Sequence, residues 1–414
     1  MSRAFRFLVL IGLLVSAGCS SLPPISLLTT PTPVPVQRAT STPQLIHTQT
    51  ARPQTQARIL RIWLPPRFDP DAETEAANLL KQRLADFESQ HPGLVIEVRI
   101  KAEEGDASLL NSLSAANLAA PTALPDLVAL PRPALEAAAL KGLLHPIDGL
   151  STALHDPDWY GYARDLGHVQ NIGYGLPFAG DAAVLVYRSD IEGGVTRENI
   201  FINGNSLSFP AGDPQGLFGL SLYISAGGEL LDSNGLPFLE QDALVKTLSW
   251  VEEGIATGSI SPSLKNVSTN NDVLAAYRSG IADMAVTWTS SMPPGLIVPV
   301  PGFGNSSHSF ATGWAWALAG SNPENQQLAI ELAEYLTVDD FIAAWTRSAG
   351  YLPTGPNSAV ASDNAVIAVL EATQAIPSNE VLQVLGPLMQ EALIRVLNGE
   401  QPEAAAGSVI EKLK

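Results

Sequence analysis

The stretch Ile59-Leu60-Arg61-Ile62-Trp63-Leu64 opens the part of the chain whose pattern decides the fold. It is typical of a buried strand, and Pro65-Pro66 ends it. A helical pattern follows from residue 73 to residue 91, with apolar side chains at three- and four-residue spacing: Ala76, Leu79, Leu80, Leu84 and Phe87. His91-Pro92-Gly93 ends that helix, and residues 94–100 alternate as a second strand.

The alternation of strand and helix continues. We expect a helix over 107–118, a strand over 126–130 and a helix over 134–141. Strands that alternate with helices predict βαβ units and a largely parallel sheet. Ligands of such sheets gather at the carboxyl ends of the strands, where the loops 63–66 and 130–133 would lie.

The rest of the chain is mainly helical in pattern. Residues 204–221 are rich in Gly, Pro and Asn, and we expect them to be irregular. No internal repeat is evident. Helices are predicted over 241–257, 270–279, 322–336, 338–348, 363–374, 379–398 and 402–413.

The N-terminus has the layout of an export signal. Arg3 and Arg6 precede an apolar run from Phe7 to Val15, which is too short to span a bilayer, and Ser16-Ala17-Gly18 precede Cys19, the only cysteine. This box is similar to that of bacterial lipoproteins, although Ser16 stands where they usually have Leu. Two readings stay open: Cys19 carries a lipid, or the signal is an ordinary secretory one and the thiol is incidental.

A Pro- and Thr-rich segment follows the cysteine. Residues 20–57 include Pro23-Pro24 and Thr30-Pro31-Thr32-Pro33 and show neither helical nor strand periodicity. We expect an extended tether that holds the body away from the membrane.

Charge excludes several kinds of partner. The 414 residues include 23 basic and 41 acidic ones; four of the basic and none of the acidic precede Arg58, so the part from Arg58 on carries 19 minus 41, or −22. A binder of nucleic acid needs clustered Lys and Arg, so we expect no nucleic-acid partner. Anionic lipid would also repel this part, which leaves the anchor as the membrane attachment. A chain of this length favours two lobes.

The sequence shows no catalytic motif. It has no Gly-x-Ser-x-Gly, no His-Glu-x-x-His, no phosphate loop and no cysteine in the body, and its six histidines lack metal-ligand spacing. Asp232-Ser233-Asn234-Gly235 faintly resembles a calcium loop but lacks the proper spacing. We therefore expect no cofactor, no metal and no catalytic residue. A glycosidase pair among the many carboxylates stays open.

Aromatic residues stand beside glycines and loops. Trp63, Trp159-Tyr160, Tyr223, Trp288, Trp314 and Tyr351 have such positions, whereas Trp250, Trp316 and Trp345 fit core positions better. Flat aromatic faces suit the apolar faces of sugar rings. Each aromatic taken singly is as well explained by the core or by an interface.

A series of short motifs occurs in an order that resembles one family, the family 1 extracellular solute-binding proteins. These are the sugar-type substrate-binding lipoproteins of ABC importers and include maltose-binding-protein-like chains. The resemblance covers nearly all of 58–414 and rests on these segments: 87–93, 95–98, 124–128, 142–148, 174–178, 184–188, 226–232, 277–286, 299–302 and 350–354. The usual Thr-Trp segment after the crossover is replaced by Val195-Thr196-Arg197-Glu198-Asn199, which lacks the Trp.

The resemblance implies a fold and a division of the chain. The fold class is α/β: a two-lobed periplasmic-binding-protein fold, type II-like, in which each lobe has a mixed, mostly parallel sheet flanked by helices and crossover segments join the lobes. The implied division is a signal peptide over 1–18, a lipidated Cys19 and tether over 19–57, lobe one over 58–178 plus 315–360, and lobe two over 183–312 plus 361–414.

The resemblance also implies the ligand contacts, at strand ends and crossovers. Aromatic faces would stack on the solute, carboxylates would accept hydroxyl hydrogen bonds, and a glycine would allow close backbone approach. The residues implied are Trp63, Asp126, Phe178, Asp181, Tyr223, Trp288, Gly313, Trp314 and Tyr351.

The function implied is that of a lipid-anchored extracytoplasmic protein, a monomer and not an enzyme. It would capture a mono- or oligosaccharide between two lobes by hinge closure and deliver it to the transmembrane permease subunits of an ABC importer. Two alternatives stay open: an anchored sensor subunit read by a signalling receptor, and a secreted glycan hydrolase.

Overall fold

The computed structural model describes residues 57–188, 191, 195–196, 199–303, 307–320, 322–360 and 362–413. The predicted signal peptide, Cys19 and all of the tether except residue 57 lie outside these residues. The strands are β1 (Arg58–Leu64), β2 (Leu94–Ile100), β3 (Leu127–Pro131), β4 (His168–Val169), β5 (Ile172–Gly173), β6 (Gly175–Tyr187), β7 (Leu207–Ser208), β8 (Met284–Trp288), β9 (Leu296–Pro299), β10 (Ser309–Leu318) and β11 (Thr373–Ala375).

Helices account for about half of the remaining described residues. They are α1 (Glu75–Gln90), α2 (Leu109–Ala119), α3 (Arg132–Leu140), α4 (Gly161–Gly167), α5 (Leu217–Ser225), α6 (Gln241–Ala256), α7 (Asn270–Arg278), α8 (Pro323–Tyr335), α9 (Asp339–Ala349), α10 (Pro356–Ala359), α11 (Asn364–Glu371), α12 (Asn379–Leu397) and α13 (Pro402–Ile410).

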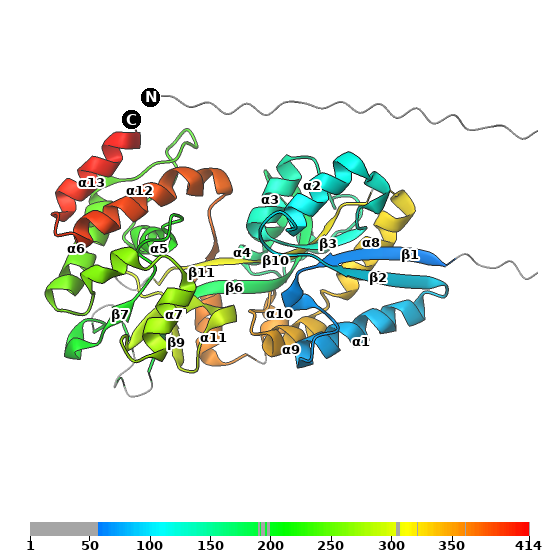
Figure 1. The fold of residues 1–414 in the computed structure, drawn as a ribbon, viewed down its shortest axis with the longest axis horizontal. Coiled ribbons are helices and arrows are strands. Elements are labelled where there is room, and N and C mark those ends of the chain that lie inside the picture. Colours follow the sequence, from blue (N-terminus) through cyan, green and yellow to red (C-terminus); the bar gives the residue numbers. More distant parts are fainter. Residues whose placement is uncertain are drawn as a thin grey trace, which may run out of the picture. The chain divides into compact units, whose positions relative to one another are not determined.

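Nine strands form one mixed sheet in the order β2-β1-β3-β10-β6-β8-β7, with β11 beside β10 and β9 beside β6. Pairs β1–β2, β1–β3, β7–β8 and β10–β11 are parallel. The long strands β6 and β10 pair antiparallel with each other and with their other neighbours β3, β8 and β9. Figure 1 shows β6 and β10 running between the elements around β1–β3 and those around β7–β9.

We call β6 and β10 the crossing strands. Two large apolar cores occupy their two ends. We call the elements around the first core lobe one; it joins β1, β3 and the start of β6 to the end of β10, α8 and α9. Lobe two surrounds the second core, which joins the end of β6, β8 and the start of β10 to α5, α6, α12 and α13. The two-lobed α/β fold that the sequence predicted is therefore present.

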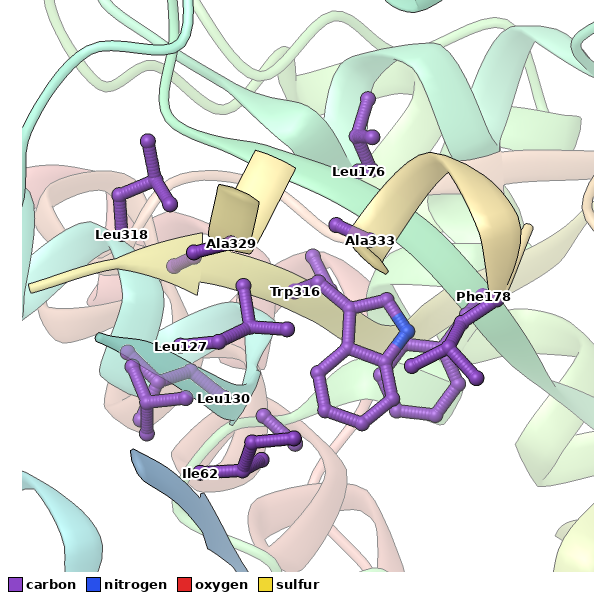
Figure 2. Packing of buried hydrophobic residues seen from close by; sticks show 14 of the residues in the cluster. Ile62, Leu127, Leu130, Leu176, Phe178, Trp316, Leu318, Ala329 and Ala333 are labelled. Carbon is purple, nitrogen blue, oxygen red and sulfur yellow. The ribbon is translucent and has the colours of Figure 1, made fainter. Parts of the chain in front are cut away.

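The core of lobe one is built on aromatic and branched side chains. In Figure 2, Trp316 of β10 stacks on Phe178 of β6, with ring centroids 4.5 Å apart and planes 20° apart. Ile62, Leu127 and Leu130 belong to the same core and lie to one side of the Trp316 ring. Because these side chains come from four strands, the core fixes the crossing strands to lobe one.

Local sequence explains most helices. Helix α1 begins at the N-cap Thr74, whose hydroxyl accepts a hydrogen bond from Ala77 N–H, and it buries Leu80, Leu84 and Phe87. The helices α6, α7, α8, α9, α12 and α13 begin within one residue of the predicted positions.

Two predictions about elements were wrong. Residues 204–221 were expected to be irregular, but 217–221 belong to α5, a helix whose residues from Leu217 to Tyr223 are all buried. A helix that is apolar all round has no amphipathic period to detect. The helix expected over 363–374 ends at Glu371, and Thr373–Ala375 pair with β10 as β11.

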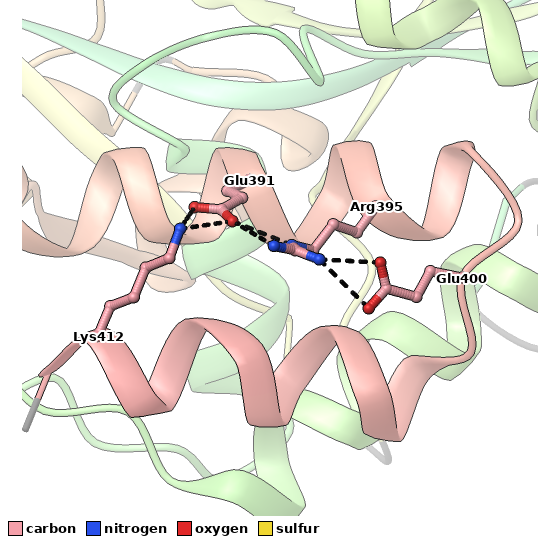
Figure 3. A network of polar contacts seen from close by, with 4 residues as sticks. All are labelled: Glu391, Arg395, Glu400 and Lys412. Atoms are coloured by element: carbon pink, nitrogen blue, oxygen red, sulfur yellow. Dashed lines mark hydrogen bonds and ion pairs between the residues drawn. The ribbon is translucent and has the colours of Figure 1, made fainter.

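A polar network joins the last two helices of lobe two. Glu391 of α12 accepts hydrogen bonds from Arg395 and from Lys412, and Arg395 also donates to Glu400 (Figure 3). All four side chains are partly exposed. The network orients the C-terminal segment against α12, whereas Ala405, Ala406 and Val409 supply its buried contacts.

Candidate ligand-binding site

One face of the crossing strands carries the chemistry. Side chains alternate along a strand, so Asp181 and Ala183 of β6 lie on the same face. Ala183 is paired with Trp288 of β8. The opposite face of β6 is closed, because a Cβ at Gly180 would lie 2.1 Å from the Tyr162 hydroxyl of α4. At Gly180 this opposite face of β6 therefore has no room for a solute.

Asp181 is held at the junction of the lobes. Its Oδ1 accepts hydrogen bonds from Thr289 Oγ1 (2.9 Å) and Ser290 N–H (3.0 Å), and its Oδ2 accepts one from Ser290 Oγ (2.6 Å). Burial raises the pKa of Asp181, while these hydrogen bonds oppose the rise. The carboxylate thus ties β6 to the turn that follows β8.

Lobe one places an arginine near Asp181. Arg67 follows β1, and its Nε and Nη2 donate to the two carboxylate oxygens of Glu103 at 2.7 and 2.6 Å. Its Nη1 donates to the Tyr351 hydroxyl at 2.8 Å, and its Cζ lies 5.5 Å from the ring centroid of Trp314. We call Arg67, Glu103, Trp314 and Tyr351 the arginine cluster. The positive charge of Arg67 acts on Asp181 and limits the rise in the pKa of Asp181.

The pKa of Arg67 reflects these partners. Burial alone would lower the pKa of the guanidinium, but its hydrogen bonds with Glu103 and Tyr351 outweigh burial and raise it above the usual value. Burial also raises the pKa of Tyr351, so its hydroxyl stays protonated at neutral pH.

Lobe two holds a cavity of about 300 Å³ beside Ala183. Trp288 and Phe218 supply aromatic walls. Polar groups come from several loops and helix starts, and none of the described lining residues is cationic. The polar lining residues are Asp213, Gln215, Ser221, Ser268, Thr269, Asn270 and Thr287. Aromatic walls with convergent polar groups are what a small polar solute with apolar faces requires.

The local sequence explains how these groups are positioned. Gly216 has φ 58°, and a Cβ there would lie 2.8 Å from Gly386 O, so the turn before α5 requires glycine. Thr269 and Asp272 form a capping box that starts α7 at Asn270. The Thr287 hydroxyl donates to Asn270 Oδ1 at 2.6 Å and fixes the amide at the cavity wall.

Comparison with known proteins gives the family. A profile of bacterial extracellular solute-binding proteins matches residues 82–368, more than half of the chain. The chain belongs to this family. No curated protein sequence matches this solute-binding protein significantly.

Solved structures resemble this solute-binding protein over most of its length. Maltose-bound MalE3 of T. maritima has a TM-score of 0.64 and 18% identity, with 86% of this chain and 99% of that chain covered. A cyclo/maltodextrin-binding protein complexed with maltotetraose has a TM-score of 0.67 and 19% identity, with 86% of this chain and 96% of that chain covered. UgpB from Mycobacterium tuberculosis in complex with glycerophosphocholine has a TM-score of 0.62 and 16% identity, with 86% of this chain and 97% of that chain covered. At these identities the similarity shows the fold.

The structure brings together four of the residues predicted for the site of this solute-binding protein. Asp181, Trp314 and Tyr351 lie in or beside the arginine cluster, and Trp288 lines the lobe-two cavity. Trp314 is 6% exposed, so only an edge of its ring is available.

The other five predicted residues lie elsewhere. Phe178 is in the core of lobe one. Trp63 is 3% exposed and covered by Lys101, whose Nζ lies 4.7 Å from its ring centroid. A Cβ at Gly313 would lie 2.3 Å from Ala179 O, so this glycine allows β10 and β6 to approach each other. It does not leave room for a solute.

Asp126 and Tyr223 have structural contacts. Asp126 precedes β3 at the amino end of a parallel strand, away from the edge where ligands gather, and accepts from Arg61 N–H and Asn325 Nδ2. The Tyr223 hydroxyl donates to Glu229 O and accepts from Glu240 N–H, which fixes the turn after α5. The ring itself is fully buried.

Sequence reasoning missed several groups at the site: Arg67, Glu103, Asp213, Phe218, Asn270 and Ser290. One signal was available for Arg67, since it directly follows Pro65-Pro66 in a loop predicted to lie at a carboxyl end. The others depend on long-range contacts, such as the two oxygens of Glu103 that meet Arg67 across 36 residues.

Other cavities lie in the described part of the chain. One of about 430 Å³ in lobe one is lined by acidic groups including Asp156, Asp158 and Asp339, and none of the predicted site residues lines it. Another of about 290 Å³ is lined by Tyr351 of the arginine cluster and by Thr289, which donates to Asp181. The larger volume alone does not make the first cavity the site, because it lies away from the crossing strands.

Two searches of the described residues were negative. They contain no group of three or more His, Cys, Asp or Glu side chains that could hold a metal ion. None of their helices has the length and apolarity needed to cross a membrane.

Proposed function

We propose that this solute-binding protein captures a carbohydrate, a mono- or oligosaccharide, and delivers it to the membrane subunits of an ABC importer. It would act outside the cytoplasm as a monomer anchored by a lipid on Cys19, and it would do no chemistry on the solute. The observation that supports this best is the lobe-two cavity, where two aromatic walls face polar side chains, with no cationic group among the described lining residues.

Closure between the lobes would couple capture to delivery. We propose 58–178 plus 315–360 as lobe one and 183–312 plus 361–414 as lobe two. A solute in the lobe-two cavity would also meet the arginine cluster of lobe one when the lobes approach. Contacts that exist only in the closed form shift the equilibrium toward it. The permease could then distinguish loaded from empty protein by its shape.

The relatives support the solute class. Two of the structural relatives are described with bound maltose and maltotetraose, and the third with glycerophosphocholine. The solute screen should therefore contain mono- and oligosaccharides together with glycerophosphocholine. A solute that binds only the native state raises the melting temperature in a concentration-dependent way. The proposal fails if no saccharide raises it.

Trp288→Ala tests the position of the site. Removing this cavity wall should weaken binding of the best saccharide by about 2 kcal/mol, or roughly 30-fold in Kd, as for a buried aromatic contact. Isothermal titration calorimetry measures the change. The matched control is Trp159→Ala, because Trp159 lines the cavity of about 430 Å³ in lobe one and its Nε1 donates to Ala153 O.

Trp159→Ala should bind the saccharide as the parent protein does. Unchanged affinity in Trp288→Ala, or an equal loss in both variants, would remove the lobe-two cavity from the site.

A further inference from the structure

We propose that this site selects uncharged solutes, and that Glu103 sets the selection by occupying Arg67, the arginine beside Asp181 that could otherwise clamp an anion. The inference rests on the proposed function, since it concerns the solute of that same site. It names a specificity-determining residue, Glu103, and a class of solute that is rejected: sugar acids and other carboxylates.

The geometry of Arg67 is the first step. A guanidinium binds a carboxylate best through two parallel N–H groups. In Arg67 the Nε and Nη2 edge already holds both oxygens of Glu103 at 2.7 and 2.6 Å. The Nη1 group donates to the Tyr351 hydroxyl at 2.8 Å. Three of the five N–H groups of Arg67 are thus engaged, and Glu103 fills the Nε and Nη2 edge that suits a carboxylate. An incoming carboxylate would have to displace Glu103 to bind this edge.

The charge around the site is the second step. Asp181 lies close enough to Arg67 for the two charges to act on each other. Asp213 and Ala183 both line the lobe-two cavity. Ala183 lies two residues after Asp181 on the same face of β6, so these two residues are about 7 Å apart. Three carboxylates thus stand against one guanidinium. An anionic solute would meet repulsion from this surplus, while hydroxyl groups would meet hydrogen-bond acceptors.

The adjoining cavity does not change this balance. Arg347 and Asp363 both line the cavity of about 290 Å³ that Tyr351 and Thr289 share, so one positive and one negative group are added. The lobe-two cavity has no cationic residue among its described lining. Arg67 is therefore the group on which anion binding would depend.

The experiment compares neutral sugars with their acids. Glucose and galactose are titrated against the full chain beside glucuronate and galacturonate, which differ by one carboxylate. The variant Glu103→Gln replaces the carboxylate with an amide whose single oxygen can accept from only one of the two N–H groups on the Nε and Nη2 edge, so this edge is held more weakly. The control Glu97→Gln removes a carboxylate from Arg99, which it contacts at 2.6 Å on the surface of β2. Both variants change the net charge equally.

The wild type should bind the acids at least about ten-fold more weakly than the parent sugars. Glu103→Gln should increase acid affinity at least about ten-fold, on the scale of a hydrogen bond to a charged group, and Glu97→Gln should leave it unchanged. The double variant Arg67→Gln/Glu103→Gln should lose the gain. Melting temperatures confirm that each variant is folded.

Other outcomes separate the inference from the function. Equal wild-type affinity for a sugar and its acid overturns the inference and leaves the function standing. Failure of Glu103→Gln to gain acid binding, or an equal gain in Glu97→Gln, also overturns it. If no neutral saccharide binds at all, the proposed function fails, and acid binding by Glu103→Gln alone would still support the role of Glu103.

Discussion

His308 is a buried titratable residue whose charge the fold opposes. It is 4% exposed, its ring lies edge-on to Phe310 with centroids 4.9 Å apart, and its buried Nε2 has no hydrogen-bond partner among the described residues. Burial lowers the pKa of His308 to about 4. Protonation in the folded state would place an uncompensated charge beside the core of lobe two.

Stability should consequently fall in acid because of His308. Its pKa in the unfolded chain is near 6.5, so between pH 6.5 and 4 the unfolded state binds more protons than the folded state does. The contribution of neutral His308 to the free energy of unfolding is complete above pH 6.5 and is lost as the pH falls toward 4. A depression of this size is worth about 3 kcal/mol of unfolding free energy.

Denaturant unfolding at a series of pH values measures this effect. His308→Gln should flatten the slope between pH 6.5 and 4 relative to wild type. Asp181 opposes the trend, because its raised pKa adds stability as the pH falls, so the two proteins must be compared with each other. Parallel pH profiles for wild type and His308→Gln would contradict the prediction.

At the residue scale, some of the residues predicted for the site lie at the candidate site and others lie away from it, for a definite reason. Asp126 and Asp181 are both aspartates at strands. Their roles differ because Asp126 lies at the amino end of β3 and Asp181 lies in the middle of a crossing strand. Likewise Trp63 and Trp288 both end strands, but only Trp288 faces a cavity. Neighbouring sequence carries no information about which side of the sheet is covered.

Helices α3 and α12 meet through a buried carboxylate. Glu136 of α3 is 5% exposed and accepts two contacts from Asn379 N–H at 3.0 and 3.2 Å, at the first residue of α12. Asn379 Nδ2 donates in turn to Pro133 O at 3.0 Å. Arg132 lies 3.6 Å from the same carboxylate. A residue of lobe one thereby satisfies a free N–H at the start of a helix of lobe two.

Glu136→Gln should lower the free energy of unfolding by about 2 kcal/mol, because it removes a charge-assisted contact and leaves Arg132 without its carboxylate. Chemical denaturation measures the loss. The control is Glu391→Gln in the partly exposed network of Figure 3, which should cost less than about 1 kcal/mol. Equal losses of unfolding free energy in the two variants would show that the burial of Glu136 does not increase its contribution to stability.

At the scale of elements, the sequence was most informative for amphipathic helices, which have one buried face and one solvent-exposed face. The boundaries of α6 and α12 could be predicted because apolar positions recur and polar caps mark the ends. Helix α3 begins two residues before its predicted start, since Pro133 suits the first turn of a helix. Helix α5 could not be found by periodicity, because lobe two surrounds it.

The crossing strands belong to the scale of the whole molecule. The resemblance to a family predicted two crossovers, and β6 and β10 are found there. It did not predict that Leu352 pairs with Gly180, which brings Tyr351 beside the site from more than 160 residues away. Contacts of such sequence separation depend on the finished fold, and no local pattern records them.

The predicted anchor also concerns the molecule as a whole. The part from Arg58 on has a formal charge of −22 and would be repelled by anionic lipid, so attachment should depend on Cys19 alone. In a bacterial host, Cys19→Ser should move the protein from the membrane pellet to the soluble fraction. Mass spectrometry should find lipid on the N-terminal peptide of the wild type. Wild type with an unmodified Cys19 would contradict the prediction.

The paired strands β3 and β10 have a consequence for biosynthesis. β3 emerges from the ribosome early, yet its partner β10 begins 178 positions later at Ser309, and α8 and α9 come later still. Until then the growing chain exposes an unpaired strand edge and the apolar side chains that Trp316 and Ala329 eventually cover. The core of lobe one therefore cannot be completed until the chain has been synthesised through α9.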